Sequence, residues 1–194
     1  MLFIDYVTLL LLNMSAAFII LALYLFRGLD DPEQGRWSLG FCMTGIVAFI
    51  FGAQMSVTWP LPGQYSSVFG DFSVFLGAIF FFAGLGMARG WRLELVATYA
   101  IPIGLASLIT AFRFFTLKLT QSPALASTGF LLTGLAALAA LPTLLFLRNN
   151  RGWRVFAGGV CLVISLIWLA NGYGGIWMHL EGFKEWVPLV MQRK

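Results

Sequence analysis

The sequence predicts an all-α integral membrane protein, a bundle of six transmembrane helices that forms a single domain over residues 1–194. Composition is the first observation behind this prediction. Of the 194 residues, 60% are hydrophobic and only 10% are charged, whereas a soluble domain carries roughly 25% charged residues. The mean hydropathy of the chain is +0.88. A surface so poor in charge needs lipid as its solvent.

The second observation is that six apolar segments are long enough to cross a bilayer, which takes about 20 residues. In chain order they are Leu2–Phe26, Ser38–Trp59, Asp71–Ala88, Leu93–Leu117, Ala124–Leu147 and Val155–Met178. None alternates between apolar and polar residues with a period of two, as the strands of a membrane barrel do. Helices are expected instead, because backbone groups in lipid must form hydrogen bonds within their own segment.

Turn-forming and charged residues separate these segments. The first gap holds Asp30-Asp31-Pro32-Glu33-Gln34-Gly35, and the second holds Trp59-Pro60-Leu61-Pro62-Gly63-Gln64. Both are loops by composition. Before the first segment there is neither a basic stretch nor a small-residue cleavage site, so we expect a retained helix rather than a secretory signal. Pro102 and Pro142 are expected to kink the fourth and fifth helices.

The distribution of arginine predicts the orientation. The odd-numbered loops carry Arg27 and Arg36, then Arg89 and Arg92, then Arg148, Arg151 and Arg154. The second loop has no basic residue, and the fourth has only Lys118. Because basic loops stay in the cytoplasm, the odd loops are predicted to be cytoplasmic and both termini to lie outside the cell membrane. The C-terminal tail, about residues 182–194, is basic and departs mildly from this rule; we expect it to lie along the outer interface.

Three similar motifs suggest an internal repeat. Arg36-Trp37, Arg89-Gly90-Trp91-Arg92 and Arg151-Gly152-Trp153-Arg154 each stand just before an even-numbered segment. They predict a bundle built as three hairpins. Three similar interfaces also explain them, since arginine and tryptophan both favour the level of the lipid headgroups.

The polar residues of the segments gather at one depth. Counting about 1.5 Å per helical residue from the arginine-bearing ends places them in the outer third of the bundle. The candidate ligand-binding residues are Asp5, Gln54, Asp71, Arg113, Asn171, Tyr173 and His179. We expect Arg113 to pair with Asp71 or Asp5, because an unpaired charge in the membrane is costly. Together they predict an outward-facing polar pocket that binds or passes a small ligand.

Each candidate also has a simpler interpretation. Asp5 and Asp71 fit acids at helix N-termini, where the helix dipole favours them. Arg113 fits a side chain that reaches the outer headgroups. Gln54 and Asn171 fit hydrogen-bond partners between helices, and a lone histidine such as His179 fits an ordinary surface residue. The shared depth of the whole set is what favours a site.

The motifs that do not occur in the sequence limit the other possible functions. No nucleotide, kinase or hydrolase motif occurs, which favours a role other than catalysis, and no basic surface with stacking aromatics indicates nucleic-acid binding. The sequence does not indicate which cofactor, if any, the protein binds. The expected partners are the lipid bilayer and either a larger membrane complex or further copies of this chain. Two alternative functions stay open. One is an accessory subunit of a larger membrane complex. The other is a metal-binding protein or metalloenzyme that uses Asp71, His179 and Glu181.

Several of these pieces together resemble a known type. They are Met1–Tyr6, Arg27-Gly28-Leu29-Asp30-Asp31, Trp59-Pro60-Leu61-Pro62-Gly63, Phe69-Gly70-Asp71 and Gly172–Glu181. With them the chain resembles, over nearly its whole length, a family of small predicted prokaryotic polytopic membrane proteins of unknown function. The resemblance implies the same helical bundle and implies no activity.

Overall fold

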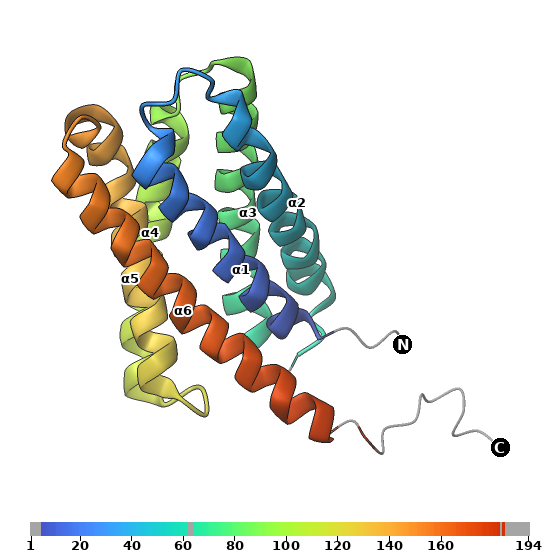
Figure 1. The fold of residues 1–194 in the computed structure, drawn as a ribbon. Coiled ribbons are helices and arrows are strands. Elements are labelled where there is room, and N and C mark those ends of the chain that lie inside the picture. The colour runs from blue at the N-terminus through green and yellow to red at the C-terminus, as the bar shows by residue number, and fades with distance from the viewer. Residues whose placement is uncertain (1–4, 62–63, 183, 185–194) are drawn as a thin grey trace.

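Six α-helices make up the fold in the computed structural model, which describes residues 5–61, 64–182 and 184. They are α1 (Tyr6–Leu23), α2 (Gly35–Thr58), α3 (Tyr65–Arg89), α4 (Glu94–Leu117), α5 (Pro123–Pro142) and α6 (Arg151–Gly182). Two π-helical turns, η1 (Tyr24–Gly28) and η2 (Thr143–Leu147), extend α1 and α5 (Figure 1). The described residues contain no strand, so the all-α prediction is confirmed. The predicted interfacial tail lies outside the described residues except for 182 and 184.

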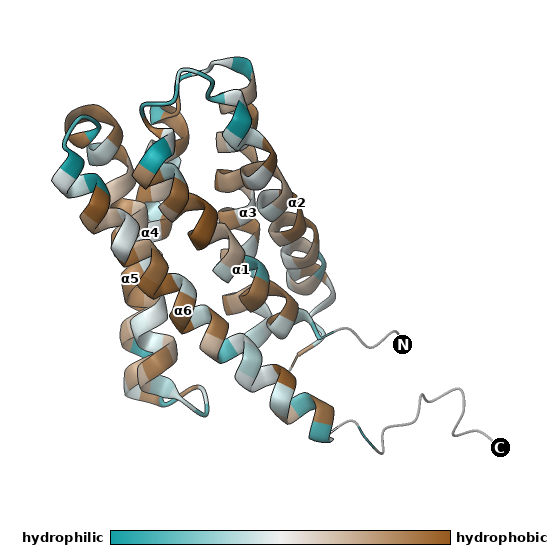
Figure 2. Cartoon of the chain, viewed as in Figure 1, coloured by the Kyte–Doolittle hydropathy of each residue, from teal (hydrophilic) through white to brown (hydrophobic). Residues whose placement is uncertain are grey.

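All six helices are long and apolar enough to cross a membrane. Figure 2 shows hydrophobic residues along the helices and the more hydrophilic ones toward their ends and loops. Large apolar side chains also face outward. On α4, for example, Leu95 is 81% exposed and Ile109 is 66% exposed. Soluble proteins rarely expose a continuous apolar surface of this kind, which agrees with the transmembrane lengths predicted from the sequence.

The bounds of two helices differ most from the prediction. Helix α3 begins at Tyr65 rather than Asp71. Its first residues suggested a loop, but Ser66 is fully buried and bonds both backbone groups of Leu61, which fixes the start of the helix. Helix α6 runs for 32 residues, beyond the predicted Val155–Met178. Its glycine-rich end stays helical and lies beside the start of α1 (Figure 1).

The helices form a closed ring in which three pairs pack most closely: α2 with α3, α4 with α5, and α6 with α1. Looser contacts of α1 with α2, α3 with α4 and α5 with α6 join these pairs. Each predicted hairpin is therefore present as two consecutive helices joined by a loop. The closest packing, however, joins a helix of one hairpin to a helix of the next, rather than the two helices of one hairpin. The arginine motifs mark the loops of the looser pairs.

Small residues explain the closest pair. A Cβ atom on Gly45 of α2 would lie 2.3 Å from the backbone nitrogen of Phe81, and one on Gly77 of α3 would lie 2.4 Å from that of Phe49. Both distances are too short for any side chain, so the two backbones approach as only glycine allows. Hydroxyl groups join the other close pairs. The Ser15 and Ser165 hydroxyls lie 2.8 Å apart between α1 and α6.

The loops with arginine share one end of the bundle. Residues 29–34, 90–93 and 148–150 all lie at the end shown uppermost in Figure 1. We call it the arginine end. The opposite end holds the start of α1, the end of α6 and the other two loops. The alternation of loops agrees with the predicted arrangement, and the side of the membrane that each end faces stays a prediction.

Candidate functional site

A cavity of about 510 Å³ lies between the helices, in the half of the bundle nearer the arginine end. Every helix contributes to its wall. One lining residue from each, in chain order, is Phe18, Phe41, Phe80, Ala100, Ala136 and Val160. The volume falls in the range of about 300–1,000 Å³ that is typical of small-molecule sites.

The wall of the cavity is almost entirely apolar, and its polar groups bond to other protein groups. The Tyr24 hydroxyl donates to Gln34 (2.8 Å), the Ser107 hydroxyl to the Phe130 carbonyl (2.7 Å), and the indoles of Trp153 and Trp168 to the hydroxyls of Thr143 (2.9 Å) and Thr133 (3.1 Å). Among the described residues, Thr120 has the one buried side-chain polar atom without a partner, and it does not line the cavity. A cavity without unpaired polar groups suits apolar contents better than water.

Aromatic rings close the cavity toward the opposite end. Phe69, Phe114, Phe130 and Trp168 come from four different helices, and we call them the aromatic cluster. The ring centroids of Phe114 and Phe130 are 5.1 Å apart, and those of Phe130 and Trp168 are 5.2 Å apart. Phe130 and Trp168 line the cavity, whereas Phe69 and Phe114 stand behind them. The cluster therefore separates the cavity from the opposite end.

Leu29 closes the cavity at the arginine end. It follows η1, lines the cavity and is only 1% exposed. Its backbone carbonyl accepts a hydrogen bond of 2.9 Å from the guanidinium of Arg148. A side chain from the far part of the sequence thus holds this loop residue over the cavity.

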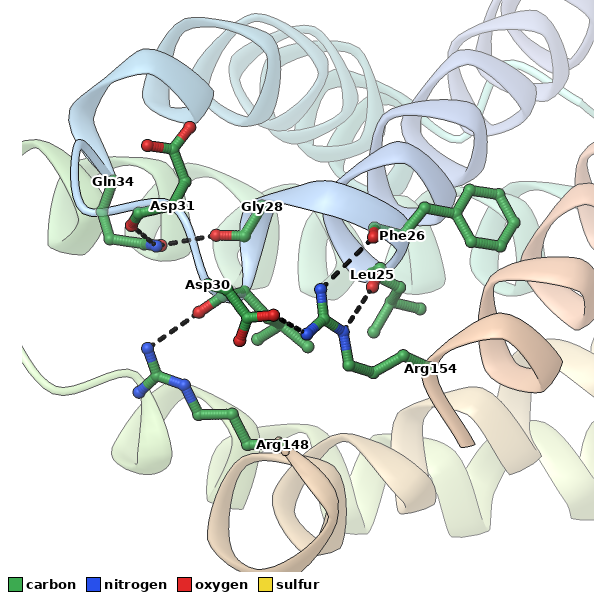
Figure 3. A network of polar contacts seen from close by, with 9 residues as sticks. Leu25, Phe26, Gly28, Asp30, Asp31, Gln34, Arg148 and Arg154 are labelled. Atoms are coloured by element: carbon green, nitrogen blue, oxygen red, sulfur yellow. Dashed lines mark hydrogen bonds and ion pairs between the residues drawn. The ribbon is translucent and has the colours of Figure 1, made fainter. Parts of the chain in front are cut away.

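Arg154 is the most deeply buried charged residue described, at 6% exposed. Its Nε donates to the Leu25 carbonyl (2.9 Å), one Nη donates to the Phe26 carbonyl (3.3 Å), and the other forms an ion pair with Asp30 (Figure 3). The last carbonyls of a helix lack partners within it and carry the negative end of the helix dipole. Arg154 therefore satisfies the end of the first helix while Asp30 balances its charge.

Gln34 and Asp31 complete this structure, which we call the arginine-end network and define as Asp30, Asp31, Gln34, Arg148 and Arg154 (Figure 3). The Gln34 amide donates to the carbonyls of Gly28 (2.7 Å) and Asp31 (2.6 Å). The backbone N–H of Glu33 and the Trp37 indole donate to the Asp31 carboxylate, and these bonds lower the pKa of Asp31.

The structure brings two of the predicted polar residues together at the opposite end. Asp5 caps α1 by accepting a hydrogen bond from the Thr8 backbone N–H (3.3 Å), and its carboxylate also contacts the Nδ1 atom of His179 in α6. The Thr8 hydroxyl lies 3.5 Å from the same histidine nitrogen. The helix-capping interpretation of Asp5 is therefore confirmed, and the capping residue also joins α1 to α6.

The other predicted residues do not join them. Asp71 lies inside α3, not at its start, and accepts a hydrogen bond of 2.6 Å from Ser56. The expected ion pair of Arg113 with Asp71 or Asp5 does not form, since both acids have other partners and Arg113 faces outward. The Asn171 amide bonds Ile167 of its own helix, and Gln54 and Tyr173 are exposed. None of the seven candidates lines the cavity.

The suggested metal site gains no support from the geometry. Within residues 5–61, 64–182 and 184, no three histidine, cysteine, aspartate or glutamate side chains lie close enough to hold a metal ion. Asp71, His179 and Glu181 therefore do not form a set of ligands. Asp71 is engaged with Ser56, and Glu181 is exposed at the end of α6.

The reasoning from sequence missed the cavity and the arginine-end network. The sequence pattern indicates only positions at the membrane interface for Arg148 and Arg154. The available signal was the pairing of two conspicuous motifs, the Gly28-Leu29-Asp30-Asp31 loop and the Arg151–Arg154 repeat. Acidic and basic groups in loops at one membrane interface are candidates for pairing, which a count of depth alone overlooks.

Comparison with known proteins identifies a family. A family model described as "Protein of unknown function (DUF981)" matches residues 1–182. No curated protein and no solved structure matches the chain significantly. The match agrees with the resemblance to a family of unknown function, and the prokaryotic origin stays a prediction.

Proposed function

The chain belongs to the DUF981 family, and we propose that it is an integral membrane protein that binds a small lipid-soluble molecule between its six helices. The observation that carries this proposal is the apolar cavity of about 510 Å³ whose polar groups all have protein partners. A ligand for such a site needs apolar surface and gains nothing from polar groups inside it.

The size of the cavity supports an occupant. Apolar walls that face a space rather than other atoms lose van der Waals contacts on that side. Filling by a hydrocarbon chain restores the lost contacts, so the cavity favours a bound molecule over an empty space.

The proposed location is the cell membrane, with the arginine end in the cytoplasm and both termini outside. The distribution of arginine among the loops supports it, because such loops resist translocation. The cavity would then open no direct path to the outer face, since the aromatic cluster lies between.

A second candidate function follows the original prediction of a polar site at the outer end. One observation favours it: Asp5, Thr8 and His179 meet where α1 and α6 adjoin. An acid, a hydroxyl and an imidazole could bind a small polar ligand there. The residues Gln54, Asp71, Arg113, Asn171 and Tyr173 would take no part unless the helices rearranged.

Saturable binding of diphenylhexatriene, an uncharged apolar fluorophore, tests the leading proposal. Trp153 and Trp168 line the cavity, so energy transfer from tryptophan to the fluorophore should report its arrival. In the purified protein in detergent micelles we expect transfer to saturate at an equimolar ratio. Replacing Ala136 with phenylalanine fills part of the cavity and should weaken binding at least about tenfold, equivalent to about 1.4 kcal/mol.

The matched control is Ala106→Phe, which adds the same side chain to an exposed position of α4. It should leave binding unchanged. Circular dichroism on both variants checks that the helices persist. Equal saturable transfer in Ala136→Phe and wild type, or transfer that never saturates in wild type, would rule out the cavity as the binding site.

A further inference from the structure

A molecule that reaches the cavity from the membrane needs a route through the side of the bundle. The aromatic cluster closes one axial end, and Leu29, held by Arg148, closes the other. Of the neighbouring pairs in the ring, α3 and α4 pack against each other least closely. The wall between these two helices is therefore the most loosely packed of the six.

A groove runs along the outside of that wall at the arginine end, lined mainly by apolar side chains of α3 and α4. Ile79, Leu93 and Val96 line both this groove and the cavity. A single layer of three side chains thus separates them. All three are half-buried, and rotamer changes of such side chains are fast compared with helix movements.

Basic and aromatic residues stand at the mouth of the groove. Gly90 follows the end of α3, and its φ of 65° turns the chain sharply. Trp91 and Arg92 come next and line the groove. Arg92 pairs with Glu94 at 3.0 Å, and its side chain is 83% exposed. Arg89 lies just before the turn, so this end of the groove has two basic residues and one acidic residue close together in the sequence.

We infer that an anionic phospholipid from the leaflet at the arginine end is the molecule this site takes up, and that it passes between α3 and α4. This inference rests on the proposed function. The acyl chain lies in the groove and crosses between Ile79, Leu93 and Val96 into the cavity. Arg92 and Arg89 bind the phosphate, as the planar guanidinium favours, and Trp91 lies at the level of the headgroups.

Lipid retention after purification tests the headgroup part of the inference. Protein reconstituted with equal amounts of phosphatidylglycerol and phosphatidylcholine is returned to detergent, and the lipids that stay bound are identified by native mass spectrometry. Wild type should retain phosphatidylglycerol preferentially. Each of Arg89→Gln and Arg92→Gln should reduce that preference about fivefold, from the attraction of one basic residue to anionic lipid.

The control is Arg151→Gln, which removes an exposed arginine at the same end but away from the groove. It should keep the preference for phosphatidylglycerol. If it lowers the preference as much as Arg92→Gln does, or if neither groove variant lowers it, the groove does not select the headgroup and the inference is overturned.

Photo-crosslinking tests the route. Phosphatidylglycerol with a photoreactive group on its acyl chain should label peptides of α3 and α4 that contain Ile79, Leu93 or Val96. Labelling confined to Leu135 and Phe156, the exposed lining residues of α5 and α6, would place the route elsewhere and overturn the inference. If the lipid-retention or the crosslinking test fails but diphenylhexatriene still binds saturably, the cavity proposal stands and only the phospholipid inference is overturned. If diphenylhexatriene does not bind saturably either, both the cavity proposal and the phospholipid inference are overturned.

Discussion

The two ends of the bundle use polar side chains in different ways. At the arginine end, Arg148 and Arg154 come from the last part of the chain and bond the carbonyls of η1 and of Leu29, which follows it. At the opposite end the polar side chains form separate contacts, Asp5 with His179 and Ser56 with Asp71, and Arg113 faces outward. One end is a connected network, whereas the other is a set of local contacts.

The difference shows that the number of polar residues at a given depth does not identify a site in which those residues contact one another. The opposite end has more polar side chains within its helices, yet they point in different directions around the ring. The arginine end has charges that ordinary interface preferences explain, yet Arg154 is buried and makes a contact through each of its three guanidinium nitrogens. Burial together with partners, rather than depth, marks the part of the molecule that closes the cavity.

Replacing Arg154 is expected to have the largest effect on the free energy of unfolding. Alanine there leaves the carbonyls of Leu25 and Phe26 without donors and Asp30 without its partner. Hydrogen bonds to charged groups contribute about 1.5–3 kcal/mol each, so we expect Arg154→Ala to lower the free energy of unfolding by about 3 kcal/mol. Denaturant unfolding in detergent, followed by circular dichroism, measures it.

Two exposed arginines serve as controls for that loss. Arg151→Ala at the same end and Arg113→Ala at the opposite end should each change the free energy of unfolding by less than about 0.5 kcal/mol. An effect of Arg113→Ala as large as that of Arg154→Ala would erase the distinction between the two ends.

A smaller effect is expected from the contact of Asp5 with His179. Both side chains are partly exposed, at 29% and 39%, so solvent screens their attraction. Asp5→Asn and His179→Gln should each cost about 1 kcal/mol or less. The double variant should cost less than the sum of the two, because removing either partner removes the same interaction. A strictly additive result would mean that the two side chains do not stabilise each other.

Much of the fold could be predicted from the sequence because hydrophobic length is a local property. All six helices lie within the predicted apolar segments or extend them by a few residues. Ser66 shows the limit: a serine near a proline-rich stretch suggests a loop, and only its burial against Leu61 makes it part of α3. The pairing of helices also escaped prediction, since it depends on which glycines face one another, as Gly45 and Gly77 show.

The site was less accessible to sequence reasoning for a physical reason. Depth along a helix follows from counting residues, but direction around the bundle depends on how each helix is rotated. Arg113 and Asn171 lie in the C-terminal halves of α4 and α6, yet one faces outward and the other bonds its own helix. A cavity is the space that packing leaves between helices, so no residue type announces it.

The smallest effect, at Asp31, tests whether charge holds the loop of the arginine end. Its pKa is lowered first by the backbone N–H of Glu33 and then by the Trp37 indole. A carboxylate whose pKa is lower in the folded protein than in the unfolded chain, where it is about 3.9, stabilises the fold at pH values above the unfolded pKa. This stabilisation is lost as the pH falls through the pKa of the folded protein. The melting temperature of Asp31→Asn should thus lie slightly below that of wild type at neutral pH, and the gap should shrink as the pH falls below about 4.

Trp37→Phe removes one of the two donors to Asp31 and should reduce the pH-dependent part of the difference in melting temperature. A gap that stays constant across this range would mean that Asp31 acts as a neutral hydrogen-bond acceptor, and that the arginine end differs from the opposite end by burial rather than by charge.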